Sequence, residues 1–148
     1  MTSNISKNYS RNFFLTKSFF NSIIKKKRLE INRIIEEEIN FEKSKNLLDV
    51  GTTPSLEKHE NQIIEYFYNK IDISCLSNLS LEELKSIYNK ITVYVGDGRE
   101  MSFVNNNFDI VTSSATIEHV GNFNNQLKFV SECLRVSKDK LFLTTPNR

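Results

Sequence analysis

The sequence predicts an α/β domain built on a doubly wound, mostly parallel β-sheet. From about residue 45 onward, short apolar runs typical of strands alternate with segments whose apolar residues recur at helical spacing. Because parallel strands need crossover connections, which are right-handed, this succession favours one sheet with helices on its faces. Of the 148 residues, 39% are apolar and 26% are charged, which is the balance of one globular domain rather than of a disordered chain.

Five short runs are predicted as strands. Gly51 ends the first of them, and the turn Gly96-Asp97-Gly98 ends the third. The second run alternates apolar with polar residues, as the two-residue period of a strand requires. The predicted strands are residues 46–50, 71–76, 91–95, 108–112 and 139–144.

Three helices are predicted between these strands. Thr53 followed by Pro54 is typical of a helix start, with the threonine as N-cap and the proline at the first helical position. Residues 80–83 match the capping box that begins a helix, and a third helix is expected around residues 125–136. The side chains expected to face the sheet are Leu56, Ile63, Ile64 and Phe67 in the first helix, Leu84, Ile87 and Tyr88 in the second, and Leu127, Val130, Cys133 and Leu134 in the third.

Composition and charge exclude several classes of protein. With 20 Lys+Arg against 18 Asp+Glu, the net charge of +2 does not indicate specific nucleic-acid binding driven by electrostatics. No apolar run approaches the roughly 20 residues that span a bilayer, so we predict no membrane span. Cys75 and Cys133 have no other Cys or His at metal-ligand spacing, so we predict buried thiols, no metal site and a cytoplasmic location.

Candidate binding residues lie just after the predicted strands. In a doubly wound sheet, ligands bind beyond the carboxyl ends of the strands, where the strand order reverses. Gly51 allows a tight backbone turn there, and the carboxylates of Asp49 and Asp97 are acceptors for an ammonium, a ribose hydroxyl or an adenine amine. Asp72 follows Asp49 by 23 positions, about where nucleotide-binding βαβ folds place a ribose-binding acid.

These residues belong to motifs that follow one another in a definite order. The motifs are Leu47-Leu48-Asp49-Val50-Gly51, Gly96-Asp97-Gly98, Phe108 to Ser114 with Ile117-Glu118-His119-Val120, Glu132 to Val136, and Phe142 to Arg148. Over roughly residues 45–148 they resemble the class I S-adenosylmethionine-dependent methyltransferases, particularly the small methyltransferase type 11 members. The resemblance implies a Rossmann-like methyltransferase fold that transfers a methyl group from S-adenosyl-L-methionine to a small-molecule or lipid-like acceptor, which the sequence does not identify.

The resemblance also implies individual roles at the matching positions. The first motif holds the methionine part of the cofactor, the acid after the third strand faces the adenine amine, and the end of the fourth strand lies beside the donor methyl group. In one register Asp72 binds the ribose hydroxyls, and in the alternative register Ser77 or Asn78 occupies that place. His119 is the predicted general base for acceptors that must lose a proton. The implied cofactor-binding residues are Asp49, Gly51, Thr52, Asp72, Asp97, Gly98, Ser113 and Ser114.

Two regions depart from the family pattern. Residues 1–44 form a helical leader in which a basic cluster follows an aromatic patch, opposite to the order of a signal peptide. We expect this leader to be a lid or packing helix over the cofactor cleft; the alternative is a membrane-surface helix, which suits a lipid-like acceptor. The family's sheet has seven strands and five are predicted here, so we expect residues 45–148 to be a partial domain, either truncated or completed by a partner or oligomer.

Two other functions remain open. Gly51 is the single glycine of the turn at residues 51–55, where the family has a glycine-rich turn, and this favours a non-catalytic remnant that binds the cofactor weakly or not at all. A nicotinamide-dependent Rossmann enzyme is the other alternative. It requires Gly-x-Gly-x-x-Gly after the first strand, and residues 51–56 lack that pattern.

Overall fold

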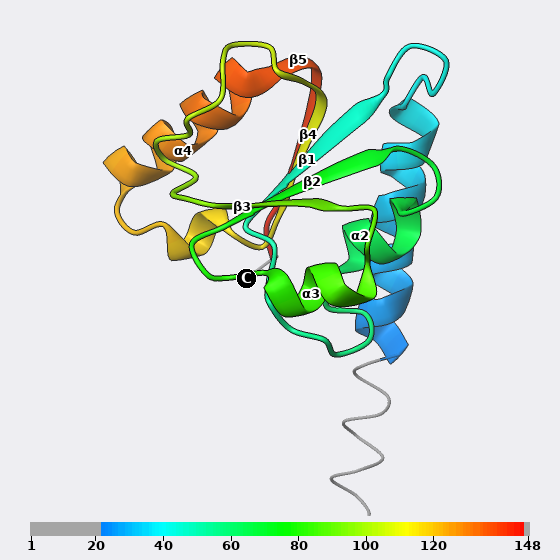
Figure 1. The fold of residues 1–148 in the computed structure, drawn as a ribbon. Helices are drawn as coiled ribbons and strands as arrows, with labels where there is room; N and C mark the ends of the chain where they lie inside the picture. Colours follow the sequence, from blue (N-terminus) through cyan, green and yellow to red (C-terminus); the bar gives the residue numbers. More distant parts are fainter. Residues whose placement is uncertain (1–21, 147–148) are drawn as a thin grey trace, which may run out of the picture. The chain divides into compact units, whose positions relative to one another are not determined.

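The predicted strands form one parallel sheet. The computed structural model describes residues 22–146, and within them five strands pair in the order β3-β2-β1-β4-β5 (Figure 1). All of these pairings are parallel, and the order reverses between β1 and β4, so the doubly wound fold is confirmed. The strands are β1 (Asn46–Val50), β2 (Asp72–Ser77), β3 (Thr92–Val95), β4 (Phe108–Ser114) and β5 (Ser137–Thr144).

Helices cover both faces of this sheet. In Figure 1, α4 lies on one side of the sheet, and α2 and α3 lie on the other. Right-handed crossovers that run in opposite directions from the centre of the sheet produce this arrangement. The helices are α2 (Gln62–Phe67), α3 (Glu82–Ile87) and α4 (Phe123–Val136), with a short 3-10 helix, η1 (Ile117–His119), after β4.

The chain divides into two compact units, Met1–Glu37 and Glu38–Arg148. Helical structure is described from residue 22 to residue 38, in the part of the leader where the sequence predicts it. The aromatic patch of the leader, at residues 13–20, lies outside the described residues. The predicted domain boundary after residue 44 and the predicted role of the leader as a lid stay predictions.

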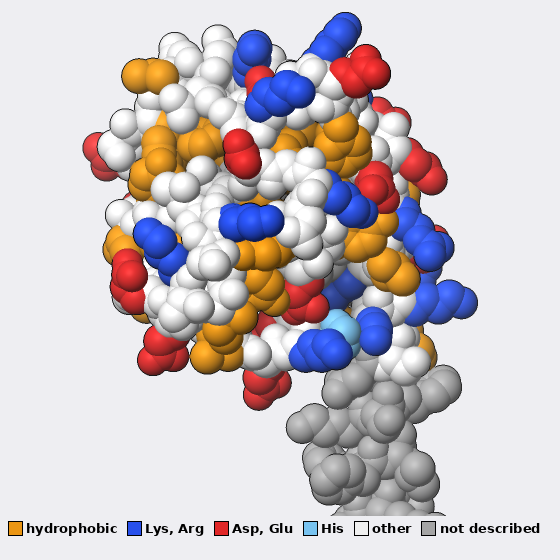
Figure 2. Space-filling model, turned by 45° about the vertical axis from the view of Figure 1, so that its right-hand side comes forward, with side chains coloured by type: hydrophobic (Ala, Val, Ile, Leu, Met, Phe, Trp, Pro, Cys, Tyr) orange, Lys and Arg blue, Asp and Glu red, His pale blue; other side chains and the backbone are white. Residues whose placement is uncertain are grey.

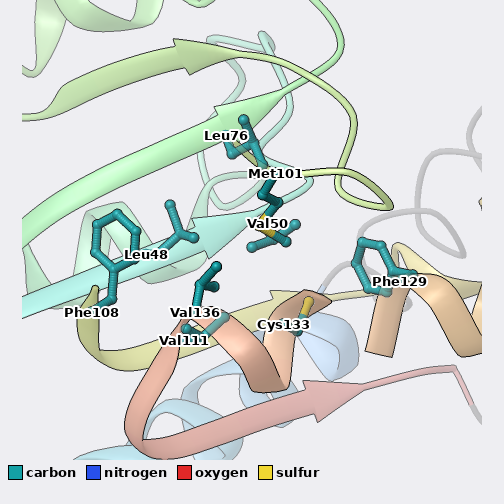
Figure 3. Packing of buried hydrophobic residues seen from close by; sticks show 9 residues of the cluster. All are labelled: Leu48, Val50, Leu76, Met101, Phe108, Val111, Phe129, Cys133 and Val136. Carbon is teal, nitrogen blue, oxygen red and sulfur yellow. The ribbon is translucent and has the colours of Figure 1, made fainter. Parts of the chain in front are cut away.

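The core between the sheet and α4 is a cluster of buried side chains (Figure 3). Leu48 and Val50 of β1 point toward α4, because alternate residues of a strand share a face. Burying side chains of this size contributes about 1.5–3 kcal/mol each before conformational entropy is subtracted, so this cluster fixes α4 against the sheet. Its members are Leu48, Val50, Leu76, Met101, Phe108, Val111, Phe129, Cys133 and Val136.

The start of α2 differs from the prediction. The Thr53-Pro54 pair lies in an irregular segment, and α2 begins at Gln62. The Thr53 hydroxyl accepts a hydrogen bond from the backbone N–H of Ser55 (3.3 Å), which makes a local turn in place of a helix cap. Leu56, which was expected to face the sheet from this helix, is 50% exposed.

The start of α3 is also corrected. Ser80 does not act as its N-cap, because the helix begins at Glu82 with Leu81 in the cap position and without a side-chain cap. Leu84 is buried as predicted, whereas Ile87 is 56% exposed. A helix of six residues buries less of its apolar stripe than the longer predicted helix would.

The buried face of α4 is rotated relative to the prediction. Leu127 and Leu134, expected to face the sheet, are 51% and 57% exposed. On the other flank of the helix, Arg135 and Glu132 bind the loop before β4. Arg135 Nη2 donates to the Met101 carbonyl (2.8 Å), and the Met101 N–H donates to Glu132 Oε2 (2.7 Å). The residues that α4 buries are Phe129, Cys133 and Val136.

Candidate functional site

The carboxyl ends of the strands meet at one edge of the sheet. The Gly51 N–H, after β1, donates to the carbonyl of Leu76 in β2 (2.8 Å). The Gly96 N–H, after β3, donates to the carbonyl of Ser77 at the end of β2 (2.8 Å). β4 ends beside β1, at the point where the strand order reverses, which is where doubly wound sheets place their ligands.

Asp49, near the end of β1, is linked by hydrogen bonds to the turn that follows this strand. Its side chain is buried, and its two carboxylate oxygens accept hydrogen bonds from the Thr52 hydroxyl (2.7 Å) and the Thr112 hydroxyl (3.0 Å). Burial raises the pKa of Asp49, and the two hydroxyl hydrogen bonds oppose that shift. The Asp49 carboxylate therefore joins β1, its turn and β4, and Thr52 is buried as part of the same network.

At Gly51 the turn after β1 packs against the loop after β4. The φ of Gly51 is +90°, in the left-handed region, and a Cβ on this residue would lie 2.2 Å from the hydroxyl oxygen of Thr116. The hydroxyls of Ser113 and Thr116 both donate to the Val50 carbonyl, at 2.7 and 3.4 Å. The loop after β4 thus lies directly against the turn after β1.

Asp97 lies at the end of β3 with its side chain 47% exposed. Arg99 holds its carboxylate: the Arg99 backbone N–H donates to Oδ1 (2.8 Å), and the guanidinium Nε donates to both oxygens (2.9 and 3.0 Å). The guanidinium Nη2 also donates to Oδ2. These hydrogen bonds with Arg99 lower the pKa of Asp97, so it is a carboxylate at neutral pH.

Close packing leaves no space for a side chain at Gly98. A Cβ on Gly98 would lie 2.7 Å from the ring of Phe129 and 3.0 Å from the side chain of Val50. Figure 3 shows both of these side chains in the core cluster under α4. The loop after β3 therefore rests directly on the core.

Ser114 joins two further elements to the site. Its hydroxyl oxygen accepts hydrogen bonds from Gln62 Nε2 of α2 (3.0 Å) and from the Thr144 hydroxyl at the end of β5 (3.0 Å). Gln62 was not among the predicted site residues, because a helix starting at Thr53 would have placed it far from the edge of the sheet. No local sequence signal identifies Gln62.

The structure corrects the prediction for Asp72. This residue is the first of β2 and pairs with Asn46 at the start of β1, so it lies at the amino edge of the sheet. The other predicted site residues lie at the carboxyl edge, at the far end of these strands. The alternative register is the one observed: Ser77 ends β2 and Asn78 follows it.

The 3-10 helix η1 carries the predicted general base. His119 is exposed, and its backbone N–H donates to the Thr116 carbonyl (2.9 Å). In the neighbouring Glu118, the Oε2 atom is buried and has no hydrogen-bond partner among the described residues. A buried oxygen without a donor is unfavourable, so a ligand that carries an N–H or O–H group would stabilise this loop.

Metal-binding clusters and membrane-spanning helices are absent from residues 22–146. No group of three His, Cys, Asp or Glu in this range could hold a metal ion, and none of its helices is long and apolar enough to cross a membrane. Cys75 and Cys133 are buried, as predicted, and burial raises the pKa of Cys133 to about 12. On the face drawn in Figure 2, basic and acidic side chains are interspersed with hydrophobic ones.

Comparisons with known proteins agree with this geometry. The chain matches the family model described as "Methyltransferase domain" over residues 48–143, and no curated protein matches it. It is similar to the solved structure of the PH0226 protein from Pyrococcus horikoshii OT3, with 16% identity and a TM-score of 0.65 over 80% of this chain and 56% of that one. It is also similar to a SAM-dependent methyltransferase from Methanosarcina mazei, with 16% identity and a TM-score of 0.58 over 71% of this chain and 52% of that one. The chain spans about half the length of these two structures, and their likeness shows the fold.

Proposed function

Because this chain belongs to the methyltransferase domain family, whose model matches more than half of it, we propose that it binds S-adenosyl-L-methionine and transfers the methyl group to a small-molecule or lipid-like acceptor. The observation that carries this proposal is the joining of three motifs at one edge. The Gly51 turn, Asp97 and Ser114 follow or end β1, β3 and β4, which are distant in the sequence, and all three lie at the carboxyl edge of the sheet. Gly51 and Ser114 lie at the topological switch point between β1 and β4, where doubly wound sheets place their ligands.

The chemistry of this edge fits such a cofactor. Gly51 presents bare backbone at a positive φ, which allows close approach of a ligand. The cofactor carries an ammonium group and an adenine amine, both of which are hydrogen-bond donors. Asp97 offers a partly exposed carboxylate, and Glu118 offers a buried carboxylate oxygen without a partner among the described residues.

We assign the residues of the edge to the parts of the cofactor as follows. The turn of Gly51 and Thr52, supported by Asp49, holds the methionine part, and Asp97 with Gly98 holds adenine. Asn78 takes the ribose hydroxyls in place of Asp72. It is exposed after β2, whereas the Ser77 hydroxyl is buried and accepts the Leu79 N–H (3.2 Å).

When bound, the cofactor supplies a methyl group activated by a sulfonium centre. The chain's contribution is alignment of the acceptor in the displacement line, which is the largest effect open to a site of this kind. Ser113 and Ser114, at the end of β4, line the place of transfer in this proposal. His119 accepts the proton where the acceptor is a hydroxyl or another protonated nucleophile.

Calorimetric titration of the 148-residue chain with S-adenosylhomocysteine tests the cofactor site. We expect binding in the micromolar range. Asp97→Ala should weaken it about tenfold or more, since a hydrogen bond to a charged group contributes about 1.5–3 kcal/mol. Asp72→Ala is the matched control, because this aspartate lies at the opposite edge of the sheet and should leave the affinity unchanged.

The same titration separates the proposal from its rival. A folded wild-type chain, verified by circular dichroism, that does not bind S-adenosylhomocysteine would contradict the proposal and support a non-catalytic remnant. The single glycine of the turn at residues 51–55 is the feature that favours this rival. Equal loss of binding in Asp97→Ala and Asp72→Ala would contradict the assignment of the adenine end.

A further inference from the structure

Arg99 occupies the acceptor positions of the Asp97 carboxylate. A carboxylate has about four lone-pair positions. At Oδ1 the backbone N–H and the guanidinium Nε of Arg99 donate at 2.8 and 2.9 Å, and at Oδ2 the guanidinium donates through Nε and Nη2. The backbone N–H and Nη2 each donate to one oxygen and the single Nε–H is shared between the two, so each oxygen accepts two contacts from the same residue.

Arg99 also reaches the loop after β4. Its Nη1 donates to the Val120 carbonyl (3.4 Å), directly after η1. One side chain therefore contacts both the end of β3, assigned above to adenine, and the loop that carries His119. The side chain of Arg99 is 38% exposed, so it can turn into solvent without opening the core.

We propose that the Arg99 guanidinium holds the position that the adenine amine takes on Asp97, and that it leaves this position when the cofactor binds. The inference rests on the proposed function. Because each Asp97 oxygen already accepts two contacts from Arg99, an adenine amine at this carboxylate competes with the guanidinium. Arg99 is thus a residue that sets the affinity and the ionic-strength dependence of the adenine end.

The strength of the Asp97–Arg99 pair is suited to such an exchange. Ion pairs between groups exposed to this degree contribute little net free energy, because water screens them and the side chains lose freedom. Displacement of the guanidinium therefore reduces cofactor affinity by a modest factor, about two- to fivefold, and does not abolish binding.

Titrations of Arg99→Met and Arg99→Lys test the proposal with two probes, S-adenosylhomocysteine and adenosine. Arg99→Met keeps the bulk of the side-chain stem and removes the donors, so it should bind both probes about two- to fivefold more tightly than the wild type. Arg99→Lys keeps the charge, so its affinity for both probes should lie between those of the wild type and Arg99→Met. Free methionine, a ligand that lacks adenine, should bind the wild type and both variants with the same affinity.

Salt provides a second measurement on the wild type. Adenosine is uncharged, so added salt acts on its binding mainly by weakening the Asp97–Arg99 pair. Raising the salt concentration from about 0.05 M to about 0.5 M shortens the Debye length about threefold. We expect this change to tighten the binding of adenosine to the wild type. The affinity of Arg99→Met for adenosine should not change.

The outcomes distinguish this inference from the proposed function. If the wild type binds S-adenosylhomocysteine and Arg99→Met binds it equally or more weakly, the displacement proposal is wrong while the cofactor site stands. If the wild type binds neither probe, the proposed function is wrong as well. Should Arg99→Met fail to fold, the salt dependence of adenosine binding to the wild type decides the question by itself.

Discussion

At the scale of single residues, the turn after β1 depends on the missing side chain of Gly51. We predict that Gly51→Ala lowers the free energy of unfolding by about 2–3 kcal/mol. About 1–2 kcal/mol comes from placing an L-residue at a φ of +90°, and the remainder comes from contact with Thr116. Urea unfolding followed by circular dichroism measures the change.

Two variants separate the causes of this loss. Gly96→Ala is the matched control: its φ is not in the left-handed region and its Cβ would lie 3.3 Å from a terminal methyl of Leu76, so a loss below about 1 kcal/mol is expected. A double-mutant cycle of Gly51→Ala with Thr116→Gly should isolate the steric part, because the single Thr116→Gly variant accounts for the lost hydroxyl hydrogen bonds. Equal stability of Gly51→Ala and the wild type would contradict the assignment of strain to this turn.

A second residue, Asp109, makes stability depend on pH. Its carboxylate accepts the backbone N–H groups of Lys45 (2.7 Å) and Asn46 (3.3 Å) and lies 3.4 Å from the Lys138 ammonium. The Lys45 hydrogen bond is the main cause that lowers its pKa. Because the folded pKa lies below the unfolded value, the stabilisation is complete above the unfolded pKa of about 3.9 and is lost as the pH falls through the folded pKa.

We therefore predict that Asp109→Asn is less stable than the wild type by about 1–3 kcal/mol at pH 7, and that this difference shrinks below about pH 4. Urea unfolding of both proteins at pH 7, 5 and 3 gives the comparison. A difference that is the same at all three values would show that the carboxylate charge has no part in it.

At the scale of secondary-structure elements, α4 holds the loop between β3 and β4 through Glu132 and Arg135. Besides the Met101 carbonyl, Arg135 binds the Phe103 carbonyl (2.6 Å) and forms an ion pair with Glu132 (2.6 Å). We predict that Arg135→Lys destabilises the protein by about 1–3 kcal/mol, because one ammonium cannot replace this fork of donors. Hydrogen exchange at the Met101 amide, which donates to Glu132, should accelerate.

Lys128→Met provides the control for the same helix. Lys128 is exposed, so its replacement should change stability by no more than about 0.5 kcal/mol and leave the exchange of the Met101 amide unaltered. If Arg135→Lys behaves like Lys128→Met, the loop is held by the core contacts of Met101 and not by the helix.

The elements also show which parts of the fold the sequence predicts. The strands were predicted to within about two residues, because a strand of a parallel sheet is an apolar run bounded by turn residues. The starts of α2 and α3 were wrong, since Thr53 and Ser80 form local turns with the backbone instead of caps. The buried face of α4 was predicted only in part, because Leu127 and Leu134 also fit a helical apolar period but are more than half exposed, whereas Cys133 is buried.

At the scale of the whole molecule, the amino edge and the carboxyl edge of the sheet differ in what their residues do. Asp109 and its partners lie at the amino edge and contribute to stability, whereas the candidate binding residues lie at the carboxyl edge. Strand order brings the predicted Gly51, Asp97 and Ser114 together, and this could be anticipated from the fold class. The place of Asp72 at the amino edge already follows from the predicted strand 71–76, in which it is the second residue, so its assignment to the ribose conflicted with that strand. The participation of Gln62 could not be anticipated, because it depends on where α2 begins.

The packing of Gly98 on Phe129 has a consequence for the evolution of this family. The ring of Phe129 fills the space that a side chain at position 98 would need, so the two positions are not independent. In relatives with alanine or a larger residue at position 98, we expect a smaller residue than phenylalanine at position 129. A change at position 129 in α4 would then affect the residue next to Asp97, so substitutions at positions 98 and 129 should occur together.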